Sequence, residues 1–348
     1  MRDSFFPYFC GVEQQAARTR VYYYDVLKVL SCVSVVALHC NAISLHRFDT
    51  GSGTWPLHVL FETLFHSGVP VFFMLSGATL LNYRERYGTR TFFLRRLRKA
   101  FVPFAAFAAL FYAVSYILLP GYDYSLRTVA GNILTGNIPL TDFWFFVPLF
   151  LIYLFMPFLA AMVRALTERQ LIALIILTGT LHAAQTAAAA LVGVTWDIPL
   201  GGYVVYTLMG YYLSRTAWER RDGVLTTVIA LAVIATALRY AAIYVSDHAV
   251  DCLFSYTSPD SFLAAAALFL LVKRLCAGAR EGCVVAFLAG KTFGVYLIQR
   301  FVITCFTALA VPPGSDALTV LFPVVYAVCV ATVAVMQRCT ATRWMVPA

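Results

Sequence analysis

Long apolar segments are the feature of this sequence that most restricts its fold. A helix needs ~20 apolar residues to cross a bilayer. Ten segments approach that length, at 22–45, 55–82, 100–119, 143–163, 170–192, 197–214, 223–245, 260–272, 283–308 and 317–337. Of the 348 residues, 61% are hydrophobic and 12% charged, whereas soluble domains have about 45–50% and about 25%. The sequence therefore predicts an all-α integral membrane protein with about ten transmembrane helices and no soluble domain.

The basic residues predict the orientation of these helices. If the connecting segments alternate across the membrane, twenty of the 26 Lys and Arg lie on one side, two on the other and four within helices. Positive residues concentrate in cytoplasmic loops, so both termini are expected in the cytosol. Residues 1–21 and 338–348 then form cytosolic tails around a membrane domain at 22–337. This distribution accounts for the net charge of +9 without a nucleic-acid partner.

Three ionisable residues share one face of the first apolar segment: Asp25, Lys28 and His39. At ~100° per residue, Lys28 and His39 differ by about 20° around a helix, and Asp25 and His39 by about 40°. Lys28 and His39 would lie about 16–17 Å apart along the axis. Lys28 could pair with Asp25 and reach toward the inner surface. It could instead hold the charged head of a long ligand whose reactive end meets His39 as a general base.

A dense basic segment follows the second apolar segment: NYRERYGTRTFFLRRLRKAF, at 82–101. One interpretation is contact with anionic lipid. The other is a site for a phosphorylated cytosolic ligand, because Arg side chains match phosphate oxygens. Coenzyme A thioesters fit the second interpretation, since they carry phosphates at one end and an acyl group at the tip of an extended arm.

Other polar residues leave alternatives open. Ser76 could be a nucleophile, or a small contact that lets helices approach each other. Glu62 and His66, four residues apart, could form an outer polar lining or satisfy each other. Arg239, Lys291 and Arg300 add charges inside predicted helices and indicate an internal polar cavity. The nine cysteines include no Cys-x-x-Cys pair, so neither a disulfide framework nor a metal site is predicted.

Six segments, in order along the chain, resemble the multi-pass membrane proteins of acyltransferase family 3. They are YYDVLKVLSCVSVVALH, in which ten residues separate Lys28 from His39, SGVPVFFMLSGATLL at 67–81, RRLR at 95–98, DFWFFVPLFLIYLFMP at 142–157, GGYVVYTLMGYYLS at 201–214 and KTFGVYLIQ at 291–299. The resemblance is closest to the bacterial branch that O-acetylates surface polysaccharides such as enterobacterial common antigen.

The resemblance implies a cytosolic acyl-CoA donor and His39 as the catalytic base. It also implies that Lys28, Arg95 and Arg98 lie near the donor phosphates, with Arg96 in the same cluster. One position departs from the family pattern: the family often ends its KTFGVYLIQ-like stretch with His, whereas this chain has Gln299. A Gln donates and accepts hydrogen bonds but does not shuttle a proton.

We therefore expect transfer of an acyl group, with acetyl favoured, from acyl-CoA to a hydroxyl of a lipid-linked or cell-surface sugar in the bacterial cytoplasmic membrane. Acetyl-CoA would be a co-substrate, and no bound cofactor is predicted. Asn41 or Ser76 could stabilise the oxyanion, and Glu62, His66 and Gln299 could contact the acceptor. The alternative is a polysaccharide or lipid exporter; a membrane sensor or scaffold is a weaker one. The sequence leaves open the acceptor, a covalent intermediate or a ternary complex, and formation of a homo-oligomer.

Overall fold

The computed structural model describes residues 21–45, 53–194, 196, 201–245, 255–280, 282–309 and 317–347. The N-terminal tail predicted at 1–21 lies outside this part of the chain except for its last residue. Within the described residues, every regular element is a helix. The α-helices are α1 (Tyr22–Leu45), α2 (Trp55–Phe65), α3 (Gly68–Leu80), α4 (Thr89–Arg96), α5 (Val102–Leu118), α6 (Leu126–Thr135), α7 (Phe146–Ala165), α8 (Glu168–Val192), α9 (Gly202–Arg215), α10 (Asp222–Val245), α11 (Pro259–Leu275), α12 (Cys283–Ala289), α13 (Thr292–Leu309), α14 (Ala317–Val320) and α15 (Phe322–Arg338).

Short helical turns extend several of these helices. Three are 3₁₀ turns, namely η1 (Tyr83–Glu85), η3 (Phe143–Phe145) and η4 (Trp218–Arg220). The fourth, η2 (Leu97–Phe101), is a π turn that joins α4 to α5 without a break. The π turn carries the last residues of the basic segment.

The predicted apolar segments all fold as helices in the part that the structure describes, although the boundaries differ. Among the described residues, seven helical stretches are long and apolar enough to cross a membrane. The predicted segments at 197–214, 260–272 and 317–337 form α9, α11 and α15, which have 14, 17 and 17 residues. The protein is thus an all-helical membrane protein, whereas the total of ten spans and the orientation stay predictions.

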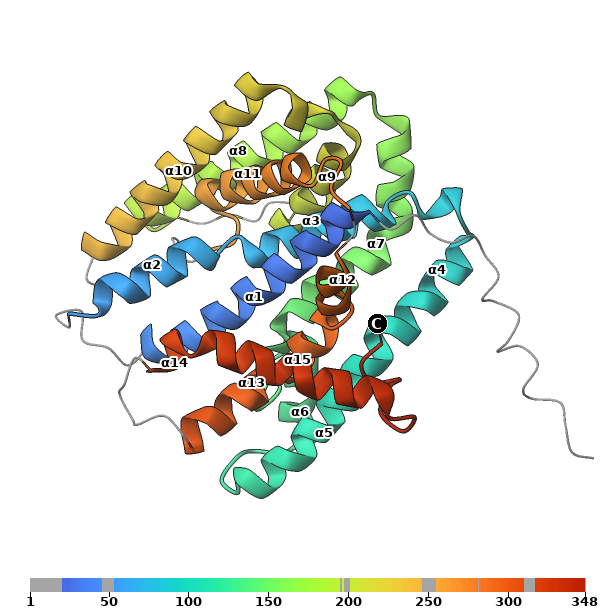
Figure 1. Cartoon of the computed structure of the whole chain (residues 1–348), viewed down its shortest axis with the longest axis vertical. Helices are drawn as coiled ribbons and strands as arrows, with labels where there is room; N and C mark the ends of the chain where they lie inside the picture. The colour runs from blue at the N-terminus through green and yellow to red at the C-terminus, as the bar shows by residue number, and fades with distance from the viewer. Residues whose placement is uncertain are drawn as a thin grey trace, which may run out of the picture.

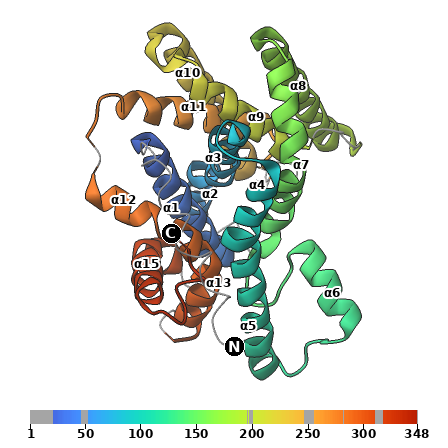
Figure 2. The same cartoon turned by 90° about the vertical axis from the view of Figure 1, so that its right-hand side faces the viewer.

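Two predicted segments are interrupted. The segment 55–82 divides into α2 and α3 at His66–Ser67, and the segment 283–308 divides into α12 and α13 at Gly290–Lys291. An additional helix, α6, forms in the connection between α5 and α7, where no helix was predicted. Figure 2 shows α6 beside α5 and apart from the remaining helices.

Helix α1 lies in the middle of the assembly. It packs against α2 and α3 on one side and against α12, α13 and α15 on the other (Figure 1). By contrast, α8 and α10 are peripheral. In the most apolar 18 residues of each helix, 17% are buried inside the protein, whereas 67% are buried in the α2–α3 stretch. Their exposed apolar faces are suited to lipid, and the ionisable residues of α1 face protein.

Close contact of two helix backbones fixes α3 against α9. A Cβ atom added at Gly77 would lie 1.7 Å from the Thr207 carbonyl oxygen, and one added at Gly210 would lie 2.0 Å from the Met74 carbonyl oxygen. Only glycine permits this approach at either position, as in small-residue packing of membrane helices. Gly77 therefore lets the two helices approach each other, next to Ser76, for which the sequence left both packing and a nucleophilic role open.

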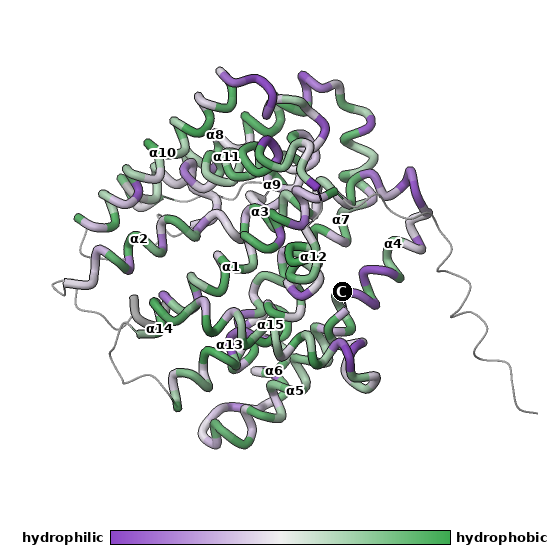
Figure 3. Tube along the Cα trace, viewed as in Figure 1, coloured by the Kyte–Doolittle hydropathy of each residue, from purple (hydrophilic) through white to green (hydrophobic). Residues whose placement is uncertain are grey.

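Hydrophilic residues are concentrated on one side of the molecule. Figure 3 shows them around α4 and at neighbouring helix ends, and the long helix interiors are mostly hydrophobic. The α4–η2–α5 stretch begins on this side and covers 30 residues, or ~45 Å of helix. This length exceeds the ~30 Å hydrocarbon core of a bilayer, so the stretch is long enough for its far end, at Leu118, to reach the opposite face.

Candidate active site

Two adjoining cavities lie beside the first part of α1, from Tyr24 to Val35. The outer one, here called the vestibule, has a volume of about 770 Å³ and is lined by Val21, Tyr24, Asp25, Lys28, Ala78, Thr79, Asn82, Glu85, Arg86, Ala286, Phe287, Ala289, Gly290 and Lys291. The second, here called the inner cavity, has a volume of about 210 Å³ and is mainly apolar. Its lining is Lys28, Val35, Val69, Phe72, Leu75, Ser76, Thr79, Leu80, Arg96, Phe145, Phe146, Leu149, Tyr153, Thr292, Phe293 and Tyr296. The two cavities share Lys28 and Thr79, so they meet at these side chains.

Lys28 stands at the junction and is held there by Asp25. Its ammonium group donates to the buried Asp25 carboxylate at 2.9 Å, which confirms the predicted pair. Lys28 nevertheless lines both cavities, so the pairing does not remove it from the path. The charged group is therefore neutralised in the absence of a ligand and still accessible to one.

Three further cations lie along the two cavities. Arg86 donates to the Thr79 carbonyl at 2.5 Å at the wall of the vestibule. Lys291 donates to the Gln337 side chain, and its ammonium group lies 4.7 Å from the Phe287 ring centroid. Arg96 lines the inner cavity, 5.6 Å from the Tyr153 ring centroid, and its buried Nε atom has no hydrogen-bond partner in the described part of the chain.

The other two predicted donor residues lie outside both cavities. The Arg95 guanidinium stacks on the Tyr87 ring, 4.3 Å from its centroid. Arg98 is exposed on the π turn η2. Among the residues predicted for the donor, the structure thus brings Lys28 and Arg96 to the cavities. It adds two cations that the sequence did not single out for the donor. Arg86 was predicted only as part of the basic segment, and Lys291 only as a charge inside a predicted helix.

His39 lies one helical turn beyond Val35, which lines the inner cavity. Its Nδ1 atom is 3.4 Å from Oδ2 of Asp142, which precedes the turn η3. Both side chains are largely shielded from solvent, at 16% and 20% exposure. Nδ1 and Oδ2 make no hydrogen bond that meets strict geometry. A separation of this kind is common in unliganded catalytic pairs and shortens on substrate binding.

Asp142 has two further neighbours on α13. Arg300 lies 3.8 Å from the same carboxylate oxygen, and the Tyr296 hydroxyl donates to the Asp142 backbone carbonyl. Tyr296 also lines the inner cavity, so it connects the cavity wall to Asp142, although neither His39 nor Asp142 is itself part of the lining. Sequence reasoning missed Asp142, although the acid stands directly before the Trp-led helix in DFWFF.

The backbone before Asp142 is unusually constrained. Gly136 ends α6 with φ 75°, and a Cβ atom there would lie 2.5 Å from the Trp144 Cα atom. Leu140 has φ 61°, a conformation that is costly for a residue with a side chain. Ile138, between them, is buried in the core. This loop therefore fixes the position of the Asp142 carboxylate relative to α1.

Gln299 is the other unsatisfied group in this region. It lies one turn along α13 from Tyr296 and is 1% exposed. Neither its amide nitrogen nor its amide oxygen has a hydrogen-bond partner among the described residues. Buried polar atoms are nearly always paired in native proteins. Gln299 is therefore equipped to donate to and accept from a bound ligand.

Ser76 and Asn41 differ in their availability. Ser76 lines the inner cavity and donates to the Phe72 carbonyl at 3.1 Å. Asn41 is fully buried and makes two contacts with His58. Its amide nitrogen donates to the His58 carbonyl at 2.9 Å, and its amide oxygen lies 2.8 Å from His58 Nδ1. Asn41 lines neither cavity.

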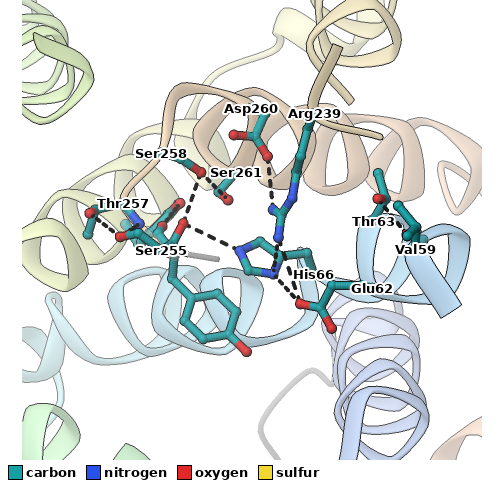
Figure 4. Close-up of polar contacts among 12 residues, drawn as sticks. Val59, Glu62, Thr63, His66, Arg239, Ser255, Thr257, Ser258, Asp260 and Ser261 are labelled. Atoms are coloured by element: carbon teal, nitrogen blue, oxygen red, sulfur yellow. Dashed lines mark hydrogen bonds and ion pairs between the residues drawn. The ribbon is translucent and has the colours of Figure 1, made fainter. Parts of the chain in front are cut away.

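Glu62 and His66 belong to a separate buried cluster. Figure 4 shows the Arg239 guanidinium between Asp260 and the Glu62–His66 pair. Arg239 donates to Asp260 at 3.0 Å and lies 2.9 Å from His66 Nδ1 and 3.7 Å from a Glu62 oxygen. His66 Nδ1 is 3.4 Å from the same Glu62 oxygen. These residues line neither cavity and tie α2 to α10 and α11. His66 stacks on Tyr256, which in turn stacks on Trp144, two residues after Asp142.

No group of three or more His, Cys, Asp or Glu side chains with metal-binding geometry occurs within the described residues. A family model described as an acyltransferase domain, Acyl_transf_3, matches residues 21–337. The chain belongs to acyltransferase family 3. Membership of this family supports acyl transfer to a hydroxyl group and makes the protein a membrane transferase. A search of curated proteins and a search of solved structures each gave no match.

Proposed function

We propose that this acyltransferase moves an acyl group, with acetyl favoured, from acyl-CoA to a hydroxyl of a cell-surface or lipid-linked sugar. The observation that carries the proposal is the connection of three features. A vestibule lined by cations adjoins a narrower, mainly apolar cavity, and Tyr296 of that cavity donates to the backbone carbonyl of Asp142, which faces His39. A charged head, a slender arm and a reactive tip would occupy these features in that order.

The vestibule supplies the charge that a coenzyme A head requires. Lys28, Arg86 and Lys291 line it, and cationic side chains bind phosphate oxygens by charge-assisted hydrogen bonds. Lys28 and His39 lie about 16–17 Å apart along α1, a span suited to the pantetheine arm. Arg96 would contact the arm within the inner cavity. Arg95 and Arg98 would add to the positive field from the flanking α4–η2 surface.

His39 would act as the general base. Because Nδ1 faces Asp142, Nε2 would take the proton from the acceptor hydroxyl as its oxygen attacks the thioester carbonyl. The Asp142 carboxylate would stabilise the imidazolium. When the tetrahedral intermediate collapses, the C–S bond breaks and the coenzyme A thiolate takes the proton from His39. The products are an O-acyl ester and free coenzyme A.

Gln299 would make a polar contact to the reactants, since its buried amide has no partner among the described residues. Its unpaired amide could donate to the thioester oxygen or accept from the acceptor hydroxyl. Ser76 could contribute a hydroxyl from the inner cavity, whereas the Asn41 amide is already bonded to His58. The Gln at 299 in place of His is compatible with a binding role and leaves proton transfer to His39.

The proposal places the protein in the bacterial cytoplasmic membrane with the vestibule open to the cytosol. The positive charge on that side supports this orientation. Family membership favours transfer over the exporter alternative, because an exporter would require neither a donor cavity nor a base.

The test uses the intact protein in lipid nanodiscs. Binding of acetyl-CoA is measured by calorimetry, and transfer is measured as radiolabel that passes from [acetyl-¹⁴C]acetyl-CoA to an alkali-labile ester in glycolipid-containing membranes. We expect binding by the wild type and by His39→Ala, and transfer by the wild type alone. Absence of acetyl-CoA binding would overturn the donor assignment. Full transfer by His39→Ala would overturn the assignment of the base.

A further inference from the structure

Helix α6 has an apolar face that none of the described residues covers. Apolar residues recur at Leu126, Val129, Ala130, Ile133 and Leu134, the spacing of one helical stripe. No residue of α6 is buried, and Leu126 and Leu134 are 85% and 75% exposed. An amphipathic helix with a bare apolar face is typical of segments that lie in the plane of a membrane surface.

The segment before α6 marks the depth of that surface. Helix α5 ends with Tyr116, Ile117 and Leu118 exposed. Three tyrosine rings then cluster at the turn, with centroids 5.3 Å apart for Tyr116–Tyr124 and 5.0 Å apart for Tyr122–Tyr124. Tyrosines gather at the boundary between hydrocarbon and headgroups. Because α5 begins near the basic segment, this boundary belongs to the opposite membrane face.

Polar contacts fix the start of α6 at this level. Ser125 caps the helix by accepting from the Thr128 backbone N–H, and the Asp123 carboxylate accepts from the Ser125 N–H at 2.9 Å. Donors from Thr128 and Ser125 lower the pKa of the Asp123 carboxyl below its ordinary value and so favour its charged form. Asn132 on α6 donates to the Tyr122 hydroxyl. The polar face of α6 is thus joined to the tyrosine turn, and its apolar stripe is left for lipid.

A short, constrained loop, 136–142, connects the other end of α6 to the candidate active site. Gly136 is in contact with the backbone of Phe143 and Trp144, directly after Asp142. The Thr141 N–H and hydroxyl both donate to the Ile138 carbonyl, at 3.2 and 2.9 Å. With the strained Leu140, these contacts make the loop 136–142 a stiff link. A displacement of α6 would therefore reach the Asp142 carboxylate.

We propose that α6 is a membrane-surface helix whose apolar stripe binds the lipid headgroup layer and thereby holds Asp142 beside His39. The partner is a lipid surface, recognised by apolar area and interfacial tyrosines and not by a specific headgroup. The second half of the proposal rests on the proposed function of His39 and Asp142; the first half does not. Leu126 and Leu134 act as positioning residues, because they touch neither donor nor acceptor.

The depth of α6 in the membrane is measured first, without any activity assay. A nitroxide label is placed at Ile133→Cys, on the apolar stripe, or at Gly131→Cys, on the polar face, where an added Cβ meets nothing within 4 Å. The other reactive cysteines are replaced by serine, and the protein is placed in nanodiscs. We expect the label at 133 to be relaxed preferentially by oxygen and the label at 131 by a water-soluble nickel chelate. Equal relaxation by the chelate, or protection of residue 133 from both agents, would overturn the lipid contact.

The coupling is tested with Leu126→Gln/Leu134→Gln, and Thr135→Gln on the polar face is the matched control. Misplacement of a catalytic group by about 1 Å can reduce a rate by 10²-fold, so we expect a kcat at least tenfold lower for the double variant. Acetyl-CoA affinity and the control should be unchanged. An unchanged kcat, with the apolar stripe shown to have left the membrane, would overturn the coupling. If no wild-type transfer occurs, the proposed function fails, whereas the depth measurement still decides the location of α6.

Discussion

His39 on α1 and Asp142 before η3 face each other at 3.4 Å, with Arg300 3.8 Å from the same carboxylate oxygen. The carboxylate therefore stands between a candidate base and a permanent cation. Asp142→Asn keeps the shape and removes the charge. General-base contributions amount to ~10²–10⁴-fold, so we expect kcat to fall by about 10²-fold or more, with acetyl-CoA affinity preserved.

Asp222→Asn provides the control for that substitution. Asp222 is an exposed carboxylate paired with Arg274 at 3.1 Å, and exposed pairs contribute little. Its kcat should equal that of the wild type. An Asp142→Asn protein with wild-type kcat would mean that the carboxylate only neutralises Arg300.

Affinity for the charged head of acetyl-CoA is expected to depend on the residues that line the vestibule. Arg86→Gln should weaken acetyl-CoA binding about tenfold, which corresponds to ~1.4 kcal/mol, and higher salt should reduce the difference. Arg90→Gln removes the same charge from an exposed position outside both cavities and should leave binding within about twofold. Calorimetry gives both values.

The double substitution Arg95→Gln/Arg98→Gln tests the prediction made from the sequence. An effect larger than that of Arg86→Gln would place the phosphates on the α4–η2 surface and not in the vestibule. A smaller effect that disappears at high salt would indicate a long-range contribution to the positive field.

How much of this site the sequence could predict depended on distance along the chain. The Asp25–Lys28 pair and the position of His39 follow from helical periodicity within one segment, and the structure bears out the pair. Asp142 meets His39 only through packing of α1 against the loop after α6, which no local pattern encodes. The break between α2 and α3 was equally hidden, because both helices are apolar. Helix α6 was missed because ten residues are too few for a membrane span.

The buried Arg239 cluster should govern stability. Removing one partner of a buried ion pair costs ~3–5 kcal/mol, because the remaining charges lose their compensation. Arg239→Gln would leave Glu62 and Asp260 without their cation, so we expect a clearly lower thermal midpoint in detergent. Arg274→Gln removes an exposed ion pair with Asp222 and should change the midpoint little. Similar midpoints for the two variants would show that the cluster is solvated.

Cys339 allows the predicted orientation to be checked. It is exposed just beyond α15, and donors from Ala341 and Thr342 lower the pKa of its thiol below the ordinary cysteine value. More thiolate is therefore present at pH 7.5 than for an ordinary cysteine, and reaction with a maleimide should be fast. In a protein whose other cysteines outside the core are replaced by serine, an impermeant maleimide should label Cys339 only in inside-out vesicles.

A matched residue for the other membrane face is Gly121, in the turn between α5 and α6. A Cβ atom there meets nothing within 4 Å, so Gly121→Cys should be tolerated. It should react only in right-side-out vesicles. Labelling of both residues from one side would mean that the number of spans between them is even, instead of the seven expected, and that the predicted count of ten is wrong.

Gln299 gives the prediction that best separates function from stability. Its two amide atoms are buried and unpaired, so Gln299→Leu removes an uncompensated polar group and should leave the thermal midpoint equal or higher. The same change should reduce kcat/KM about tenfold or more if the amide contacts the reactants. Gln337→Leu is the contrasting control, since the Gln337 amide donates to the Gly290 and Val346 carbonyls at 3.0 and 2.9 Å. That variant should lose stability. A Gln299→Leu protein that is less stable and equally active would show that the amide serves the fold and not the reaction.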